Sequence, residues 1–503
     1  MRRALHSLAV AAVLCALPGA ALAQTLTFEH GCTTGTRIRI AAVGDLLFHN
    51  ALQRRALTPT GNFRQFWQPV QPILDAADIV YGNLEGPAAE AVAAGGIAVK
   101  DPGRGFDGRV YGMTPGALVF NFHPSVIADL KASRFSVVST ANNHAADRGG
   151  LGIDRTIDTL RRAGIAFTGT RKRDEPDGHW STVTSAKGLS IGWLACSYST
   201  NGMPDRGGQV LNCYRDRELV MAELRRLAAD PSVDAVILTP HWGHEQSHQP
   251  LASDRGYARA AIDAGADAVL GAHPHVLQPW DKHVTPDGRE GLIVYSLGNF
   301  ISNQQRPAQR SGVIALIDVV KAEGQPKARV AAAGFVPTWV DFTSAGHRVT
   351  EMKGDGAGKQ SPLAATLQIL PRGNRVTGAT LDALPRPLCP EMPIALAPPS
   401  EPLPKLALIE PVVAPEAEAP RSGVALEEPA APQPPQIVEV RTSDPPIETV
   451  AATTYLPVVV PLMIPFPAER QPPPSGPNPP RVALRVDRRE PGTVLHPDDP
   501  PTT

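Results

Sequence analysis

Proline is distributed very unevenly along this sequence, and its distribution limits which part of the chain can form a regular fold. Of the 52 prolines, 31 lie between Pro385 and Thr503. Proline lacks a backbone N–H and fixes φ, so a segment this rich in proline cannot build regular helices or sheet ladders. We therefore expect residues 385–503 to form a disordered, extended, proline-rich tail, and the folded part of the chain to end before it.

The first 23 residues have the three parts of a signal peptide. Two arginines give a positive start, an apolar run follows at residues 8–17, and Ala21-Leu22-Ala23 forms a small-residue cleavage site before Gln24. The apolar run is shorter than the roughly 20 residues that a membrane-spanning helix needs. No later apolar run reaches that length either, so we expect a periplasmic or secreted mature chain without a transmembrane segment.

The charge balance argues against nucleic acid as a partner. The formal net charge of the whole chain is -1, and removal of the signal peptide with its two arginines makes it -3. A nucleic-acid-binding domain usually carries an excess of basic residues, which this chain lacks.

Four cysteines remain after the signal peptide is removed: Cys32, Cys196, Cys213 and Cys389. An even number in an oxidising compartment is compatible with two disulfides, for which three connectivities exist. We favour Cys196 with Cys213, which a loop separates. Cys32 with Cys389 would then tie together the two ends of the folded region. Four unpaired thiols are the alternative.

Between residues 37 and 350, short β-rich runs alternate with helical patterns, which is typical of an α/β fold. We expect a short N-terminal segment at 24–36 before this domain and an extension at 351–384 after it, which could add one more hairpin. Asp216 and Ser253 are expected to cap two of the helices. The expected helices are residues 125–133, 152–163, 216–229 and 253–264. The expected strands are residues 39–47, 78–84, 135–140, 165–169, 189–197, 233–240, 266–271, 291–297 and 312–319.

Five of these strands end in side chains that can bind a metal or a phosphate. In open α/β sheets ligands bind at the carboxyl ends of the strands, so we expect the five clusters to converge on one crevice. Carboxylates combined with imidazoles suit manganese, iron or zinc, so the sequence predicts a divalent metal site. The clusters are Val43-Gly44-Asp45, Gly82-Asn83-Leu84-Glu85, Ala141-Asn142-Asn143-His144, Pro240-His241-Trp242-Gly243-His244-Glu245 and Gly271-Ala272-His273-Pro274-His275.

Together with one later motif, these residues resemble the ordered motifs of the CapA (PgsA) family. That family is named for poly-γ-glutamate capsule synthesis and belongs to the calcineurin-like metallophosphoesterase superfamily. The resemblance implies a four-layer α-β-β-α sandwich of the metallophosphoesterase type over residues 37–350, and it does not extend to the proline-rich tail. Its motifs here are Gly44-Asp45, Asn83-Leu84-Glu85, Ala141-Asn142-Asn143-His144 with Asp147, His241-Trp242-Gly243 with Glu245, Gly271-Ala272-His273-Pro274-His275 and Ser296-Leu297-Gly298-Asn299-Phe300.

The resemblance also implies a metal ligand for each matching position. It places Asp45 and His275 on a first metal and makes Glu85 the carboxylate that bridges two metals. Asn143 would bind the second metal through its amide oxygen. His241 and His273 would complete that second site.

Four further residues are candidates for roles around these ligands. His144 would match the superfamily's catalytic histidine, which protonates a leaving group while the metal activates a water and polarises a phosphoryl or carbonyl oxygen. Asp147 belongs to the same motif. Glu245 follows His241 by four residues, and we expect it to orient a ligand histidine. Asn299 could hydrogen-bond substrate or simply cap a strand end.

One position departs from the superfamily pattern. The superfamily has Asp-x-His on its first strand, but Asp45 is followed by Leu46 and Leu47, which leaves the first metal site one ligand short. His49 lies nearby at the wrong spacing and is expected to be an ordinary loop histidine. We therefore expect one or two ions, with unequal affinities if two bind.

Two functions remain open on the sequence. The first is an exported metal-dependent hydrolase or transferase acting on a phosphoester or on an anionic or amide-linked cell-envelope polymer. The second is a non-catalytic accessory or polymer-binding protein of capsule synthesis and export. In either case the proline-rich tail could contact envelope or capsule-export proteins.

Overall fold

The computed structural model describes residues 25–114, 116–175, 178–344, 346–356 and 361–389. The signal peptide expected at residues 1–23 and the tail beyond residue 389 lie outside the described residues. Within this part of the chain, no helix combines the length and the apolar character needed to cross a membrane.

The first of two large sheets carries the early strands of the chain. Its strands are β1 (Thr36–Leu46), β2 (Ile79–Leu84), β7 (Phe135–Ser139), β8 (Ala166–Thr168), β15 (Asn299–Ile301), β16 (Ser311–Lys321), β17 (Arg329–Thr343) and β18 (Gly346–Glu351). The order is β18-β17-β16-β1-β2-β7-β8, and β15 pairs with β1. From β1 to β8 the strands are parallel, whereas β16, β17 and β18 form an antiparallel flank.

The second large sheet carries the middle of the chain. Its strands are β9 (Ser181–Ala186), β10 (Leu189–Ser197), β11 (Ala235–His241), β12 (Ala268–Leu270), β13 (Trp280–Val284) and β14 (Glu290–Val294). The order is β13-β14-β12-β11-β10-β9, in which the four inner strands are parallel and the two edge strands antiparallel. Two small hairpins stand apart: β3 (Val92–Ala93) with β4 (Ile97–Ala98), and β5 (Gly112–Met113) with β6 (Phe120–Asn121).

The two large sheets face each other across a buried apolar core. Ile40 of β1, Val137 of β7 and Ile237 of β11 belong to this core. Tyr81 of β2 stacks on Trp193 of β10 with ring centroids 5.3 Å apart, which joins the centre of one sheet to the centre of the other.

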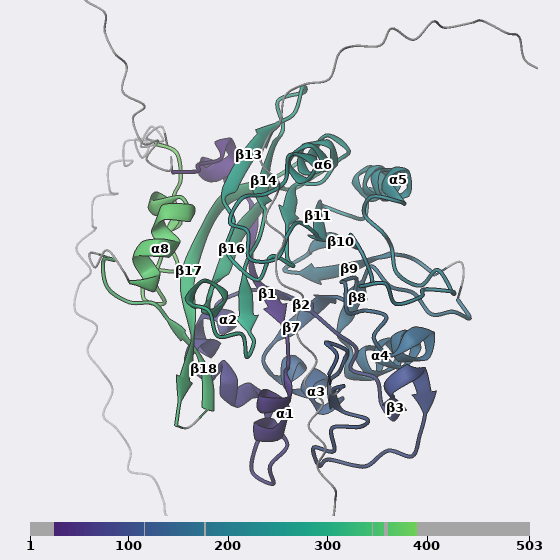
Figure 1. Cartoon of the computed structure of the whole chain (residues 1–503). Coiled ribbons are helices and arrows are strands. Elements are labelled where there is room, and N and C mark those ends of the chain that lie inside the picture. Colours follow the sequence, from purple (N-terminus) through teal and green to yellow (C-terminus); the bar gives the residue numbers. More distant parts are fainter. Residues whose placement is uncertain (1–24, 115, 176–177, 345, 357–360, 390–503) are drawn as a thin grey trace, which may run out of the picture. The chain divides into compact units, whose positions relative to one another are not determined.

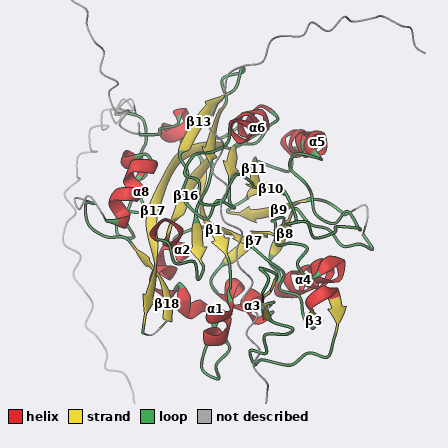
Figure 2. Cartoon of the chain, in the orientation of Figure 1, coloured by secondary structure: helices red, strands yellow, loops and turns green. Residues whose placement is uncertain are grey.

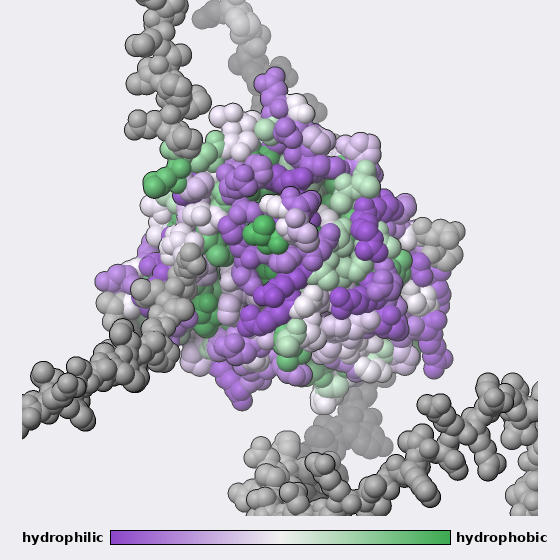
Figure 3. All heavy atoms as spheres, turned by 90° about the horizontal axis from the view of Figure 1, so that it is seen from above, coloured by the Kyte–Doolittle hydropathy of each residue, from purple (hydrophilic) through white to green (hydrophobic). Residues whose placement is uncertain are grey.

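Helices α1 (Asn50–Ala56), α2 (Gln71–Asp75), α3 (Ser125–Ala132), α5 (Arg217–Ala229) and α6 (Ala252–Asp263) cover the outer faces of the two sheets (Figures 1 and 2). The other helices are α4 (Gly149–Ala163), α7 (Pro307–Arg310) and α8 (Pro362–Ile369). Side chains of α1, α2 and α3 share a core with the first sheet, and those of α5 and α6 share a core with the second. The resulting α-β-β-α sandwich confirms the expected fold. The face drawn in Figure 3 is mostly hydrophilic, with apolar residues in small separate patches.

All nine expected strands and all four expected helices are present, with ends shifted by a few residues. One expected cap is correct in position only, and the other is wrong. Asp216 is the N-cap residue of α5, but its carboxylate accepts from the Asn212 N–H instead of the helix. Ser253 lies inside α6, whose N-cap residue is Leu251.

The hairpin expected within residues 351–384 is also wrong. The antiparallel pair β17–β18 ends at Glu351, and the segment after it contains α8 and a 3-10 turn at Arg372–Asn374. Leu363 and Leu367 of α8 join the core between the sheets. The reason is the sequence of α8, whose run Leu-Ala-Ala-Thr-Leu has good helix formers behind Pro362 at the first helical position.

Both favoured disulfides are confirmed: Cys32 pairs with Cys389, and Cys196 pairs with Cys213. The ends of the described chain are also joined by hydrogen bonds. The Asn374 side chain accepts from the Leu26 N–H at 2.8 Å and donates to the Leu26 carbonyl at 2.8 Å. The N-terminal segment is thus tied to the C-terminal one by covalent and polar links.

Candidate metal centre

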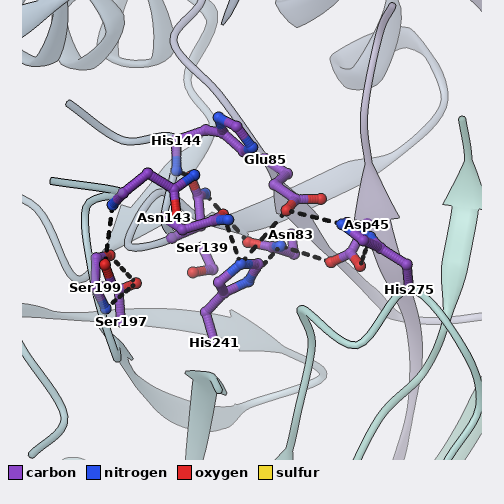
Figure 4. Close-up of polar contacts among 12 residues, drawn as sticks. Asp45, Asn83, Glu85, Ser139, Asn143, His144, Ser197, Ser199, His241 and His275 are labelled. Carbon is purple, nitrogen blue, oxygen red and sulfur yellow. Dashed lines mark hydrogen bonds and ion pairs between the residues drawn. The ribbon is translucent and has the colours of Figure 1, made fainter. Parts of the chain in front are cut away.

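The polar strand ends of both sheets meet at one edge of the sandwich (Figure 4). Asp45 lies near the end of β1, and Glu85 directly follows β2. His241 is the last residue of β11, and the loop after β12 carries two more histidines. Parallel strands deliver their carboxyl ends to the same edge, which is why residues separated by some 230 positions become neighbours.

Glu85 occupies the middle of this group. Its Oε1 lies 3.4 Å from His241 Nε2 and 3.7 Å from His275 Nε2. Neither carboxylate oxygen has a hydrogen-bond partner, although the residue is fully buried. Burial raises the pKa of Glu85 well above its ordinary value, against the opposing charge of His275. A buried carboxylate without a donor is the kind of group that a cation satisfies.

His241 is held from both ring nitrogens. Its Nε2 lies 2.9 Å from Asn143 Oδ1, and its Nδ1 lies 3.2 Å from Asn83 Nδ2. Asn83 Nδ2 in turn donates to Asp45 Oδ1 at 2.8 Å. Burial, followed by the neighbouring histidines, lowers the pKa of His241 well below its ordinary value, so the imidazole is neutral.

His275 and His273 differ in their surroundings. His275 Nδ1 lies 3.0 Å from Asp45 Oδ2 and 3.0 Å from Asn299 Oδ1. Burial alone would lower the pKa of His275, but the charge of Glu85 and the hydrogen bond with Asp45 outweigh it and raise the pKa to about 10. Burial lowers the pKa of His273 to about 3, and its Nδ1 is buried without a partner. A neutral imidazole with a free nitrogen is the form that ligates a metal.

The ligand atoms fall into three overlapping groups, within each of which they lie no more than 4.8 Å apart. Glu85 belongs to two of them, and Asn143 contacts the first through His241. The structure therefore brings together all six residues expected to bind metal. Their donor set and the orphaned oxygens of Glu85 fit a divalent cation. The groups are Glu85 with His241 and His273, Asp45 with Glu85 and His275, and Glu245 with His273 and His275.

Two histidines of this centre have a strained backbone. His273 has φ of 99° and His275 has φ of 58°, in the left-handed region that residues other than glycine rarely adopt. Gly271, at the start of the same loop, leaves no room for a side chain, because a Cβ there would lie 2.0 Å from the Tyr295 carbonyl oxygen. The close packing of the loop holds both imidazoles toward Glu85, and strain of this kind concentrates at functional sites.

His144 lies beside the ligands without belonging to any of the three groups. The chain turns after β7, with the Ala145 N–H bonded to the Asn142 carbonyl and the Asp147 N–H bonded to the His144 carbonyl. His144 Nδ1 lies 2.9 Å from Asp147 Oδ2, which also accepts from the Phe120 N–H at 2.6 Å. In Figure 4 the imidazole lies close to Glu85. Asp147 thus orients His144 through one nitrogen and leaves the other available.

The family of the chain follows from a comparison with known families. Residues 39–304, more than half of the chain, match the family described as "Bacterial capsule synthesis protein PGA_cap". The chain belongs to this family.

Three curated proteins illustrate its relatives. The capsule biosynthesis protein CapA of Bacillus anthracis is 27% identical over 280 residues, which cover 51% of this chain and 62% of that protein. The PGA biosynthesis protein CapA of Bacillus subtilis is 27% identical over 274 residues, covering 52% and 62%. A probable polyglutamine synthesis accessory protein of Mycobacterium tuberculosis is 27% identical over 204 residues, covering 37% and 50%. The match thus spans less than two thirds of each relative's length.

Two solved structures share parts of the fold at low similarity. The sulfate thiohydrolase SoxB of Thermus thermophilus, in complex with glycerol, matches with a TM-score of 0.34 and 12% identity, covering 62% of this chain and 56% of that chain. PhoD matches with a TM-score of 0.31 and 8% identity, covering 67% and 76%. Scores this low do not support a comparison of sites.

In this PGA_cap member, two residues of the centre make contacts that the sequence analysis did not predict. Asn83 was part of a strand-end cluster but had no role, although it links Asp45 to His241. Tyr198 packs its ring 4.5 Å from that of His273 and directly follows β10. The strand-end rule applied to β10 would have identified Tyr198, because β10 is the parallel neighbour of β11.

The structure also shows the surroundings of the remaining candidate residues. Glu245 groups with the ligand histidines His273 and His275, whereas the contacts of His241 go to Asn83, Asn143 and Glu85. Asn299 is buried, with its Nδ2 donating to Gln304 and to the Gln309 carbonyl while its Oδ1 contacts His275. Leu47, at the position of the missing superfamily histidine, is buried in the core between the first sheet and its helices. His49 lies in none of the ligand groups.

Proposed function

We propose that this chain is an exported, metal-dependent hydrolase or transferase that acts on a capsule or other cell-envelope polymer, such as poly-γ-glutamate. The observation that carries the proposal is the buried, unpartnered carboxylate of Glu85 between two histidines. The names of its Bacillus relatives support a role in capsule polymer synthesis. Two disulfides support an oxidising compartment outside the cytoplasm.

Residues of the proposed site divide into ligands and groups that hold them. Asp45, Glu85, His241, His273 and His275, with the amide of Asn143, would hold one or two divalent ions. A bound divalent cation would supply Lewis-acid polarisation of a phosphoryl or carbonyl oxygen and an activated water. The buried environment excludes bulk water, which strengthens every charge interaction at the site.

His144 has the position expected of a general acid. Its Nδ1 is held by Asp147, so the ring is fixed and its other nitrogen can carry a proton to a leaving oxygen or nitrogen. Its ring also packs edge-to-face against Phe120 at 4.8 Å between centroids, which limits its rotation. The proposed catalytic group is thus positioned by contacts outside the ligand set.

A non-catalytic accessory role is the second candidate, and it has one observation in its favour. Leu47 takes the place of a ligand histidine and is buried in an apolar core, so it cannot contribute to the first metal site. A relative of Mycobacterium tuberculosis is itself named a probable accessory protein. In this role the same centre would bind polymer or serve as a structural metal site.

Metal content and turnover, measured on the same preparations, test the proposal. After manganese loading, His273→Ala should lose bound metal, whereas His283→Ala, at a histidine paired with Asp263 away from the centre, should keep it. His144→Ala should keep its metal yet lose turnover of a phosphoester or γ-glutamyl polymer by about a hundredfold or more. Unchanged turnover would remove His144 from the catalytic group. A wild-type protein that binds metal but is inert toward both substrates would favour the accessory role.

A further inference from the structure

A cavity of about 510 Å³ is lined in part by Asp147. Asp147 is the residue that holds His144, so the cavity begins one contact away from the proposed catalytic group. Its other walls come from Gly95, from the start of α4 and from the loops that follow β8 and β10. The lining includes Gly149, Gly150, Arg173, Arg206 and Gln209.

Two arginines give this cavity a positive wall. The Arg173 side chain is 60% exposed, and its guanidinium forms an ion pair with Asp154 at 3.9 Å that is too long for a hydrogen bond. Arg206 is exposed and has no hydrogen bond or ion pair with any described residue. Both guanidinium groups are therefore available to an anion, and arginine binds carboxylates with two parallel hydrogen bonds.

The start of α4 adds to this positive character. Gly149 and Gly150 form its first two positions, no acidic residue lies in its first turn, and no side chain caps it. The backbone amides at a helix N-terminus carry partial positive charge and favour anions. An anion held by the arginines would thus also interact favourably with the helix.

Gln209 provides evidence independent of the positive charge, because its Oε1 is a buried acceptor without a donor. The side chain is fully buried, and its Nε2 donates to Asp154 Oδ1 at 2.7 Å and to the Arg171 carbonyl at 3.2 Å. These acceptors fix the orientation of the amide and leave its Oε1 buried without a partner. Leaving a buried acceptor unpaired is unfavourable, so a ligand N–H would be favoured there.

The acceptor and one arginine lie side by side over Gly150. A Cβ at Gly150 would lie 2.4 Å from Gln209 Oε1 and 2.6 Å from Arg173 Nη2, so these two atoms are within about 5 Å of each other. The bare backbone of Gly150 makes room for both. A ligand that fits this pair needs an anionic group and an N–H donor separated by a few ångströms.

We propose that this cavity is a binding subsite for an acidic residue of an amide-linked polymer. The carboxylate binds Arg173 and Arg206 at the start of α4, and the amide N–H donates to Gln209 Oε1. A polyphosphate offers no N–H and leaves Gln209 unpaired, so the geometry favours the amide-linked polyacid. The inference rests on the proposed function, since it makes the cavity the place where such a polymer lies beside His144.

Equilibrium binding to the full mature, metal-loaded chain tests the subsite without requiring turnover. The probe is a fluorescently labelled γ-linked glutamate oligomer, measured by anisotropy at low salt. Arg173→Gln and Arg206→Gln should each raise Kd roughly tenfold, the effect of losing one charge-assisted hydrogen bond. Arg259→Gln is the matched control for the first, because it is 55% exposed and 3.8 Å from Asp281. Arg225→Gln, on the exposed side of α5, is the control for the second.

Competing ligands test the acceptor. A polyacrylate of equal charge has carboxylates without N–H groups and should bind roughly tenfold more weakly than the glutamate oligomer. Equal binding of polyacrylate, tighter binding of polyphosphate, or unchanged affinity in both arginine variants would overturn the subsite. Turnover measured in parallel separates the two proposals. If the arginine variants keep the wild-type KM, the subsite is contradicted and the proposed enzyme activity is not. If the wild-type protein binds the oligomer but has no activity, the proposed enzyme activity is contradicted and the subsite is not.

Discussion

Burial sets the protonation of single residues at the candidate centre. It lowers the pKa of His241 and of His273, so both imidazoles are neutral, and it raises the pKa of Glu85. The two neutral histidines can bind a metal without losing a proton, whereas the raised pKa of Glu85 works against the deprotonated form that a ligand carboxylate needs. The binding of a divalent cation should therefore weaken in acid.

Outside the ligand set, the protonation of His49 should make the free energy of unfolding depend on pH. Burial, opposed by its bond to the Leu47 carbonyl, lowers the pKa of His49 to about 4. The unfolded chain takes up a proton near pH 6.5 that the folded chain does not, so stability falls as pH drops from about 6.5 to 4. Between pH 7 and pH 5 the wild type should lose about 1 to 2 kcal/mol more than His49→Gln, as measured by urea unfolding. His179→Gln, at an exposed histidine, is the control. Parallel pH profiles for the wild type and His49→Gln would contradict the prediction.

At the scale of elements, sequence patterns found the strands that carry the site and missed several others. The strands β2 and β11, and β1 after Arg39, are mostly apolar because both faces are buried, so they are easy to recognise. The long strand β17 was missed because its alanines and Pro337 argue against a strand. The edge strand β9 is mostly polar and half-buried, so it has no clear apolar face.

Local patterns also decide which residues of the site could be predicted from the sequence. Strand-end ligands could be predicted because parallel strands share an edge, whereas contacts between the sheets depend on packing that no local pattern records. Asn83 joins Asp45 of its own sheet to His241 of the other. Arg173 and Gln209 come from loops far from any motif, and only the folded chain places them over Gly150.

A substitution at Gly44 would test how closely β1 must approach the loop at Gly298. A Cβ there would lie 1.8 Å from the Gly298 carbonyl oxygen, which accepts the Asp45 N–H. Gly44→Ala should therefore push β1 away from this loop, displace Asp45, weaken metal binding and cost on the order of 3 kcal/mol of unfolding free energy. Calorimetry and metal analysis would measure both effects.

The matched control is Gly256→Ala on α6, where a Cβ would meet no atom within 4 Å. It should be neutral or stabilise the chain by about 0.5 to 1 kcal/mol, because alanine favours the helix. If Gly44→Ala retained wild-type stability and metal content, the close approach of β1 would not be required for the site.

On the scale of the whole molecule, the disulfide between Cys32 and Cys389 joins positions separated by 357 residues. Replacing both cysteines by serine should lower the unfolding free energy by about 3 kcal/mol, because the unfolded chain gains freedom. Metal content should stay unchanged, because neither cysteine lies in a ligand group. Urea unfolding of the oxidised wild type, the reduced wild type and the double variant would show the loss. An oxidised wild type no more stable than the other two would contradict it.

The same covalent link decides how the domain responds to mechanical tension. Force applied between the segment before Cys32 and the segment after Cys389 passes directly through the sulfur atoms, because the disulfide bypasses every residue in between. Once the hydrogen bonds between Leu26 and Asn374 have broken, the hydrogen-bonded ladders of β1 and β17 bear little of the pull, and the ligands at the strand ends keep their spacing. An attachment outside this bridge could therefore hold the protein against a moving polymer without distorting its metal centre. After reduction, the same pull would run through the sandwich itself.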